Sequence, residues 1–163
     1  MPVTPDALFD RFAELGIAVE RHDHPPLHTV EESRSLRGEI PGGHCKNLFL
    51  KDKKGALWLV VTLEETPIDL KALPKHIGSA RLSFGKPDLL YETLGVLPGA
   101  VTPFALINDT DLMVNVILDA AMMEHDLLNY HPLVNTTTVT IARDDVLKFI
   151  AACGHKPDIV ALG

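Results

Sequence analysis

The sequence predicts an α+β fold: a curved, largely antiparallel mixed sheet, or a partly open barrel, with helices at its periphery. Its 163 residues suit one domain spanning 1–163, with the core expected at about 8–150. With 46% hydrophobic residues, the chain has enough apolar surface to form that core without disulfides. Expected helices are interleaved with hairpins, and few strands alternate singly with helices as in a doubly wound parallel sheet.

The N-terminal half is expected to begin with a helix and continue into a hairpin. Thr4 suits the N-cap, Pro5 the first helical position and Gly16 the end of this first helix. The elements expected next are a strand at 17–21, a short helix at 29–37, a hairpin of strands 45–51 and 56–62, a helical turn at 69–73 interrupted by Pro74, and a strand at 81–84.

The C-terminal half is expected to alternate between helices and short strands. Gly95 suits the end of a helix at 87–94, and a Gly/Pro-rich loop follows at 95–103. The remaining expectations are a second hairpin of strands 104–108 and 112–118, a helical patch near 120–128, a strand at 136–141, a helix at about 143–153 and a loose C-terminal tail.

The net charge of −7 argues against a general nucleic-acid binder, and no helix-turn-helix pattern suggests DNA binding. The segment from Arg34 to Lys86 departs from this average, because it holds ten basic and five acidic residues and is therefore +5. A basic middle permits contact with a small anionic surface, whereas chance clustering on a solvated face is the alternative explanation.

The standard cofactor and catalytic motifs are absent: the chain has no P-loop, GxGxxG, GxSxG or HExxH. His22, His24 and His28 are the densest histidine group, but prolines interrupt them, so we expect no metal and no cofactor. Cys45 and Cys153 form no CxxC and are expected to be reduced and inert.

No apolar segment of the sequence suggests secretion or membrane insertion. The first ten residues lack the apolar stretch of a signal peptide. The longest strongly apolar run, at 56–61, is far too short to cross a bilayer. We therefore expect a cytoplasmic protein with no membrane partner.

Three segments, taken together and in order, resemble the YbaK/prolyl-tRNA-synthetase-associated editing domains, and most closely the free-standing ProXp-ala (PrdX-type) branch. They are Lys46–Leu50 (KNLFL), Leu97–Phe104 (LPGAVTPF) and Tyr130–Thr137 (YHPLVNTT). The resemblance covers about residues 8–150. It implies hydrolysis in trans of aminoacyl-tRNA mischarged by prolyl-tRNA synthetase, with alanine on the proline tRNA as the substrate of this branch.

The resemblance implies that Lys46 lies against the phosphate or ribose of the terminal adenosine, where it would act by positioning the substrate. A general base with a lowered pKa and an ordinary solvent lysine are the alternatives. Gly99 lets substrate approach the backbone of a loop whose amides can stabilise the ester oxyanion, and Pro103 stiffens the exit of that loop. An ordinary connecting loop is the alternative there.

A synthetase site that binds proline rejects the smaller alanine by only about 1–3 kcal/mol, so some tRNA is mischarged. A second pocket, in the editing domain, that admits only small side chains would correct this error. The residues expected to wall it are apolar and flank the two loops; they are Val30, Leu48, Leu50, Ala100 and Val101. Ordinary core packing is the alternative for each of them, and for Leu48 and Leu50 the two alternatives have equal weight.

The remaining candidate site residues are polar. Arg81 is proposed for the phosphates of the CCA end, with a structural salt bridge as the alternative. Asn47 would contact substrate or cap a strand edge, while His131 would hold the attacking water or the α-amino group with support from Asn135; a structural turn role is the alternative for these last two. Arg34 and Arg37 are plausible contacts to the tRNA near the first base pairs.

The expected partner is the acceptor end of a mischarged proline tRNA, and prolyl-tRNA synthetase is a second candidate partner. A non-catalytic module that binds a tRNA end or a synthetase is the alternative function. The residues leave open the identity of the general base, to which the vicinal ribose hydroxyl of the tRNA would contribute, and the choice of alanine over cysteine, serine or threonine.

Overall fold

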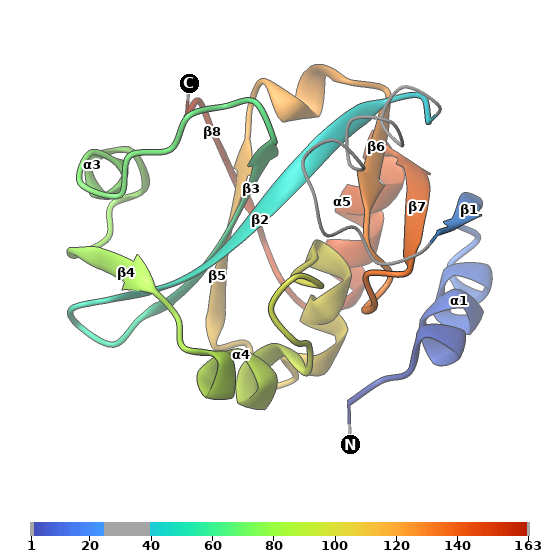
Figure 1. Ribbon diagram of the computed structural model, residues 1–163, viewed down its shortest axis with the longest axis horizontal. Helices are drawn as coiled ribbons and strands as arrows, with labels where there is room; N and C mark the ends of the chain where they lie inside the picture. The colour runs from blue at the N-terminus through green and yellow to red at the C-terminus, as the bar shows by residue number, and fades with distance from the viewer. Residues whose placement is uncertain (1, 25–39, 163) are drawn as a thin grey trace.

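The computed structural model describes residues 2–24 and 40–162, which form one mixed sheet with helices around it (Figure 1). Within these ranges the sheet has eight strands in the order β1-β7-β6-β2-β3-β5-β8, with β4 also paired to β2. The strands are β1 (Val19–Asp23), β2 (Gly43–Asp52), β3 (Leu57–Leu63), β4 (Leu82–Phe84), β5 (Val114–Asp119), β6 (Leu127–Tyr130), β7 (Thr137–Ala142) and β8 (Asp158–Val160).

The sheet is mixed, as the sequence predicts. Four strand pairings are antiparallel (β1–β7, β2–β3, β2–β4 and β6–β7) and three are parallel (β2–β6, β3–β5 and β5–β8). The strand order runs from β1 at one end to β8 at the other without closing, so the sheet is open and not a barrel.

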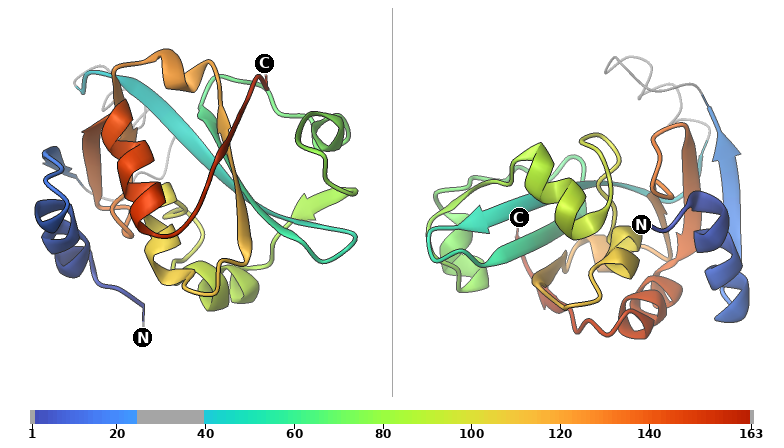
Figure 2. Two further views of the ribbon diagram at one scale, coloured as in Figure 1. Left: turned by 180° about the vertical axis from the view of Figure 1, so that it is seen from behind. Right: turned by 90° about the horizontal axis from the view of Figure 1, so that it is seen from below.

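Helices flank this sheet. They are α1 (Pro5–Glu14), α3 (Leu73–Ile77), α4 (Pro87–Leu94), α5 (Arg143–Ala152) and two 3-10 helices, η1 (Pro103–Asn108) and η2 (Met122–Glu124). The two views of Figure 2 show α1 beside β1 and α5 packed across the strands β6 and β7. None of the helices in the described part of the chain combines the length and the apolarity needed to cross a membrane.

Two hydrophobic clusters occupy opposite faces of the sheet, because successive residues of a strand point to opposite sides. Along β3, Leu59 and Val61 belong to the larger cluster, and Trp58 and Val60 to the smaller one. In the larger cluster the ring of Phe104 lies 5.0 Å from that of Phe12 and 5.4 Å from that of Phe149, measured between centroids. These edge contacts join α1, η1 and α5 into one core.

Most of the predicted elements are confirmed, and their terminal residues act as expected. The Thr4 hydroxyl caps α1 by accepting from the amide of Ala7, at 3.2 Å. Gly95 ends α4 with a φ of 67°, in the left-handed region that glycine adopts without cost. The β2–β3 hairpin, β4, β7 and α5 also lie within two residues of their predicted bounds.

Predictions are wrong in four places, namely the hairpin at 104–118, the helical turn before Pro74, the end of the helical patch near 120–128, where residues 127–128 begin β6, and the C-terminal tail. The segment 104–108 is not a strand but the 3-10 helix η1, because Pro103 occupies its first turn and the Thr102 hydroxyl accepts from the Phe104 amide. The second hairpin therefore does not exist, and β5 pairs in parallel with β3. Pro74 does not interrupt a helical turn but lies in the first turn of α3.

The C-terminal tail is not loose. Its residues 158–160 form β8, which pairs in parallel with β5. The predicted helix at 29–37 falls outside the described residues.

Candidate functional site

The candidate site lies where the sheet is split. One edge of β2 is paired with β3 over Cys45–Lys51, but the other edge is shared. It pairs with β6 at Gly43 and His44 and with β4 at Leu50–Asp52. Between these two contacts the edge of β2 has no strand partner among the described residues, so the consecutive residues 45, 46 and 47 are all accessible from that side.

A cavity of about 190 Å³ occupies this gap, and it brings together three segments that are far apart in the sequence. It is lined by Cys45, Lys46 and Asn47 of β2, Gly99 and Val101 of the loop after α4, and His131, which follows β6. Five of these six residues are sequence-predicted site residues. Cys45 was missed as a lining residue, although its place two positions before Asn47 on the same strand was a usable signal.

The backbone of the Gly99 loop is held open by a tight turn. The amide of Ala100 donates to the carbonyl of Leu97 at 3.0 Å, and Gly99, the third residue of the turn, has a φ of 94°. This is the type II arrangement, with proline second and glycine third. The turn uses the Ala100 amide, whereas the amides of Gly99 and Val101 donate to no group in the described residues. Both amides are therefore backbone donors available to a ligand.

Asn47 presents an unused acceptor. Its Oδ1 atom is buried and has no hydrogen-bond partner within the described residues. Leaving a buried polar atom unpaired costs about 1–3 kcal/mol, so native proteins retain such atoms rarely and often at functional sites. The Asn47 oxygen is therefore suited to accept a hydrogen bond from a ligand.

His131 is a neutral base at pH 7. Burial lowers its pKa below the usual 6.5, partly offset by the hydrogen bond to the Thr137 carbonyl, and nearby His24 lowers it further. The Nδ1 atom lies 3.0 Å from that carbonyl oxygen, which can only accept, so Nδ1 carries the hydrogen. The lone pair that can accept a proton is consequently on Nε2.

The other two polar features of the cavity differ in reactivity. Lys46 is half-buried and forms no ion pair or side-chain hydrogen bond within the described residues, so its ammonium is available to an anionic ligand. Burial raises the pKa of the Cys45 thiol to about 12, with hydrogen bonds to Tyr130 and Asn129 opposing the rise. A protonated thiol is a poor nucleophile, so Cys45 acts here as a small apolar wall.

Several predicted site residues lie outside this cavity. Leu48 and Leu50 lie on the same face of β2 as Lys46 but farther along the strand, where they pack on the smaller core cluster. Leu50 is fully buried there, and neither residue lines the cavity. Ala100 and Pro103 are buried and do not line the cavity. Asn135 lies beside the loop, with its Nδ2 atom 3.8 Å from where a Cβ of residue 99 would be.

The structure separates Arg81 from Lys46. Arg81 lines a different and larger cleft at the other end of β2, so it does not share a cavity with the Gly99 loop. Three further candidates, Val30, Arg34 and Arg37, lie outside the described residues. No group of three or more histidine, cysteine, aspartate or glutamate side chains in the described residues is arranged to hold a metal ion.

Comparison with known proteins decides the family. Residues 24–149 match the model of the aminoacyl-tRNA editing domain. The chain belongs to this family. Members hydrolyse the ester bond between an amino acid and tRNA, and the chain is accordingly an aminoacyl-tRNA deacylase.

Related sequences extend over almost the whole chain. The prolyl-tRNA synthetase associated domain-containing protein 1 of Bos taurus is 40% identical, over 94% of this chain and 92% of its own length. The prolyl-tRNA editing protein ProX of Acetoanaerobium sticklandii is 36% identical, over 91% of this chain and 92% of its own length. A crystal structure described as a putative trans-editing enzyme for prolyl tRNA synthetase has a TM-score of 0.71 at 16% identity, over 98% and 97%, which confirms the fold.

Proposed function

We propose that this editing domain acts in trans on proline tRNA carrying a wrong amino acid, with Ala-tRNA(Pro) as its main substrate. The observation that carries the proposal is the cavity at the split edge of β2, which Lys46 and Asn47 line together with Gly99 of the loop and His131. The relatives named for prolyl-tRNA synthetase and for prolyl-tRNA editing support the choice of tRNA. Prolyl-tRNA synthetase is the proposed protein partner.

The proposed mechanism uses water and no covalent intermediate. Nε2 of His131 accepts a proton from water, whose oxygen attacks the ester carbonyl carbon. The amides of Gly99 and Val101 stabilise the negative charge that develops on the carbonyl oxygen, at a typical worth of about 3 kcal/mol per donor. The bond from the carbonyl carbon to the ribose oxygen then breaks, and the ribose oxygen takes up the proton. Free amino acid and uncharged tRNA leave.

Two residues of β2 hold the substrate in this scheme. Asn47 Oδ1, which is buried and unpaired, accepts from the α-ammonium group of the amino acid. Lys46 contacts the phosphate or ribose of the terminal adenosine and aligns the ester with the backbone donors. The ribose hydroxyl next to the ester can assist the proton transfer.

The size of the cavity favours a small amino acid. A volume of about 190 Å³ must accept the aminoacyl group and part of the ribose, which leaves little room beyond a methyl side chain. Cys45 and Val101 are the apolar walls available to it. Because a shape sieve of this kind discriminates one methylene by only about 10- to 200-fold, serine and cysteine are the competing substrates.

The test is a deacylation panel with purified protein and proline tRNA carrying alanine, cysteine, serine or proline. We expect rapid hydrolysis of the alanyl ester and none of the prolyl ester. Lys46→Ala should nearly abolish hydrolysis without changing the circular dichroism spectrum, whereas Lys71→Ala, at an exposed lysine remote from the cavity, should match the wild type.

Two outcomes would contradict the proposal. Hydrolysis of none of the four esters would favour a module that binds a tRNA end without cutting it. A Lys46→Ala protein with the wild-type single-turnover rate would remove Lys46 from the site.

A further inference from the structure

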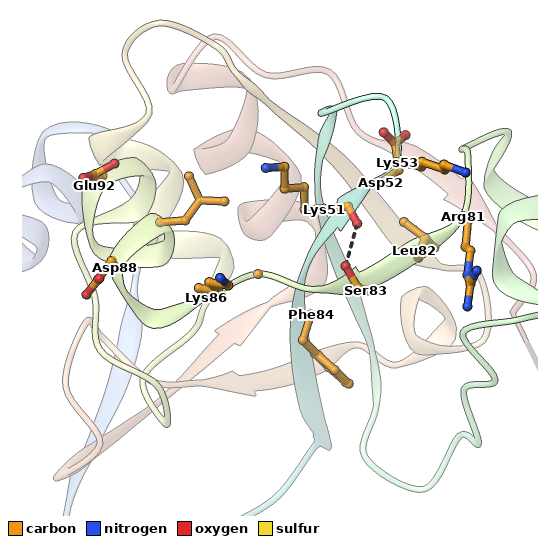
Figure 3. Close-up of a pocket in the computed structure, with 12 residues that line it drawn as sticks. Lys51, Asp52, Lys53, Arg81, Leu82, Ser83, Phe84, Lys86, Asp88 and Glu92 are labelled. Carbon is orange, nitrogen blue, oxygen red and sulfur yellow. Dashed lines mark hydrogen bonds between the residues drawn. The ribbon is translucent and has the colours of Figure 1, made fainter.

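A second, larger cleft opens at the other end of β2. It has a volume of about 790 Å³ and lies between the end of β2, β4 and the start of α4. Figure 3 shows the side chains that line it. Those that bear on its ligand are Lys51, Lys53, Arg81, Phe84 and Lys86.

The basic side chains of this cleft have no acidic partner among the described residues. All four of its basic side chains are exposed, and none forms an ion pair or side-chain hydrogen bond within the described residues. Of the three acids, Asp52 is buried and occupied by hydrogen bonds from the amides of Lys54, Ala56 and Ala80 and from the indole of Trp58. In a chain of net charge −7, a group of four free cations marks a surface for an anion.

The two remaining acids, Asp88 and Glu92, both belong to α4. Figure 3 shows them on the helix side of the cleft, with Lys53 and Arg81 at the opposite end. Lys86, the residue before α4, lies near Asp88 on this side (Figure 3), whereas Lys51, Lys53 and Arg81 lie toward the strands, where fewer acids oppose a polyanion.

Phe84 adds an exposed aromatic face. It is the last residue of β4, paired with Leu50 of β2, and it is 62% exposed. The next residue extends the pairing, since the Gly85 amide donates to the Phe49 carbonyl at 2.9 Å. A Cβ at Gly85 would lie 2.3 Å from the Phe49 ring, so only glycine lets β4 approach this closely. The pairing thus fixes Phe84 on the face of the sheet opposite to Lys51, so a nucleic-acid strand that contacts both must pass over the edge strand β4.

The two clefts lie along the same strand. Residues 45–47 of β2 line the small cavity, Lys51 and Asp52 line the larger cleft, and α4 with its following loop contributes residues to both. From Asn47 to Lys51 the strand rises about 13 Å. That distance corresponds to about four stacked nucleotides of one strand.

We propose that this cleft binds the acceptor strand of the tRNA, with Lys51, Lys53 and Lys86 on backbone phosphates and a base stacked on Phe84. The inference rests on the proposed function, because it takes the 3′ terminus to occupy the Lys46 cavity. Spaced lysines together with an aromatic platform are the combination that binds single-stranded nucleic acid. Arg81, expected at the CCA end, belongs to this surface instead.

The test separates RNA binding from hydrolysis by using uncharged proline tRNA. Phe84→Ala and Lys51→Gln/Lys86→Gln should each weaken its binding by roughly tenfold, as loss of a stacked base or of two phosphate contacts does. The matched control, Lys148→Gln/Lys156→Gln, removes two exposed lysines on and beyond α5 and should bind as the wild type does.

A second measurement ties the cleft to the reaction. The ratio of kcat/KM for alanyl-tRNA to kcat/KM for alanyl-adenosine, an ester too short to reach the cleft, should fall about tenfold in the cleft variants. Lys46→Ala should instead lower both values.

Three results would overturn the proposal. One is wild-type affinity for uncharged tRNA in both cleft variants. Another is binding of inorganic phosphate or of a polyglutamate peptide that tRNA does not displace, since the cleft would then serve a small anion or an acidic protein. The third is equal loss on alanyl-tRNA and alanyl-adenosine. A protein that binds tRNA through the cleft but hydrolyses no ester would refute the proposed function and leave this inference standing.

Discussion

At the scale of single residues, the candidate site depends on atoms that the fold leaves unpaired. Asn47 Oδ1 is buried without a partner, and the amides of Gly99 and Val101 donate to no described group. By contrast, the Cys45 thiol, which the sequence predicts to be inert, is kept protonated by burial. The chemistry therefore falls to polar atoms poised for a ligand and to His131, the one cavity residue with a lowered pKa.

The pH dependence of hydrolysis should report His131. Its pKa in the folded protein is below 6.5, so the imidazole is the neutral base at pH 7 and becomes protonated as the pH falls through that lowered value. We expect kcat, corrected for uncatalysed hydrolysis, to be level from pH 8 to 7 and to fall only below about pH 6.5. His131→Asn should lower kcat by about 10²- to 10⁴-fold and abolish this acid limb.

The exposed His76 supplies the control for that profile. His76→Asn should retain the wild-type rate and the wild-type acid limb. An acid limb that survives in His131→Asn would show that another group is the base.

At the scale of elements, the important feature is the unequal pairing of the two edges of β2. One edge is continuous with β3, while the other is divided between β6 and β4. Residues of β2 line both the cavity and the larger cleft. The carboxylate of Asp52 closes the β2–β3 turn and also binds the amide of Ala80, just before β4. Asp52 thus links the hairpin to the strand that carries Phe84.

Asp52→Asn should destabilise the protein by about 1–3 kcal/mol at pH 7, because the amide group cannot accept all four hydrogen bonds. Although burial alone would raise its pKa, the hydrogen bonds from the Trp58 indole and the surrounding amides hold the pKa of Asp52 below 3.8. A lowered pKa gives stability that is present above pH 3.8 and is lost as the pH falls through the native value.

Urea denaturation of wild type and Asp52→Asn at pH 7 and at pH 3 measures this effect. The difference in unfolding free energy should be smaller at pH 3. Asp111→Asn, at an exposed carboxylate, should change neither value. If the difference in unfolding free energy between wild type and Asp52→Asn is the same at both pH values, the ionised form of Asp52 is not what stabilises the turn.

At the scale of the whole molecule, an acidic protein must attract a polyanion through a local surface. The net charge is −7, yet the segment 34–86 is +5, and the structure gathers four of its cations in one cleft. The rest of the surface repels RNA and would restrict binding to this side. Affinity for tRNA should therefore depend strongly on ionic strength.

In a plot of log Kd against log salt concentration, we expect a slope of about 3 if four cations contact phosphates of a single strand. Affinity would then fall roughly 50-fold between 50 and 200 mM salt. Lys51→Gln/Lys86→Gln should reduce the slope by between 1 and 2, and Lys148→Gln/Lys156→Gln should leave it unchanged. A flat salt response in the wild type would exclude the basic cleft from tRNA binding.

Caps and residue periodicity predicted correctly those elements whose structure depends only on neighbours in sequence. Caps at Thr4 and Gly95 and the alternation of β2 and β3 need only neighbours in sequence, and these elements lie where expected. Two predictions were wrong for different reasons. The segment 104–108 is apolar enough for a strand, but Pro103 and the Thr102 cap start a 3-10 helix, and Phe104 then packs against Phe12 and Phe149. The tail has a strand partner, β5, that is distant in sequence, and the Asp119 carboxylate also accepts from the Leu162 amide.

The sequence by itself determined the family, the kind of fold and the segments from which the site is built, because residue types and their order along the chain are sufficient for these. Only the tertiary structure decided which side chains share a cavity. Leu48 and Leu50 are in the same segment as Lys46 but face a core, and Arg81 lies at another cleft. The physical reason is that a site forms across elements: β2 meets the Gly99 loop and His131 only where its edge lacks a strand partner, and no local pattern records that gap.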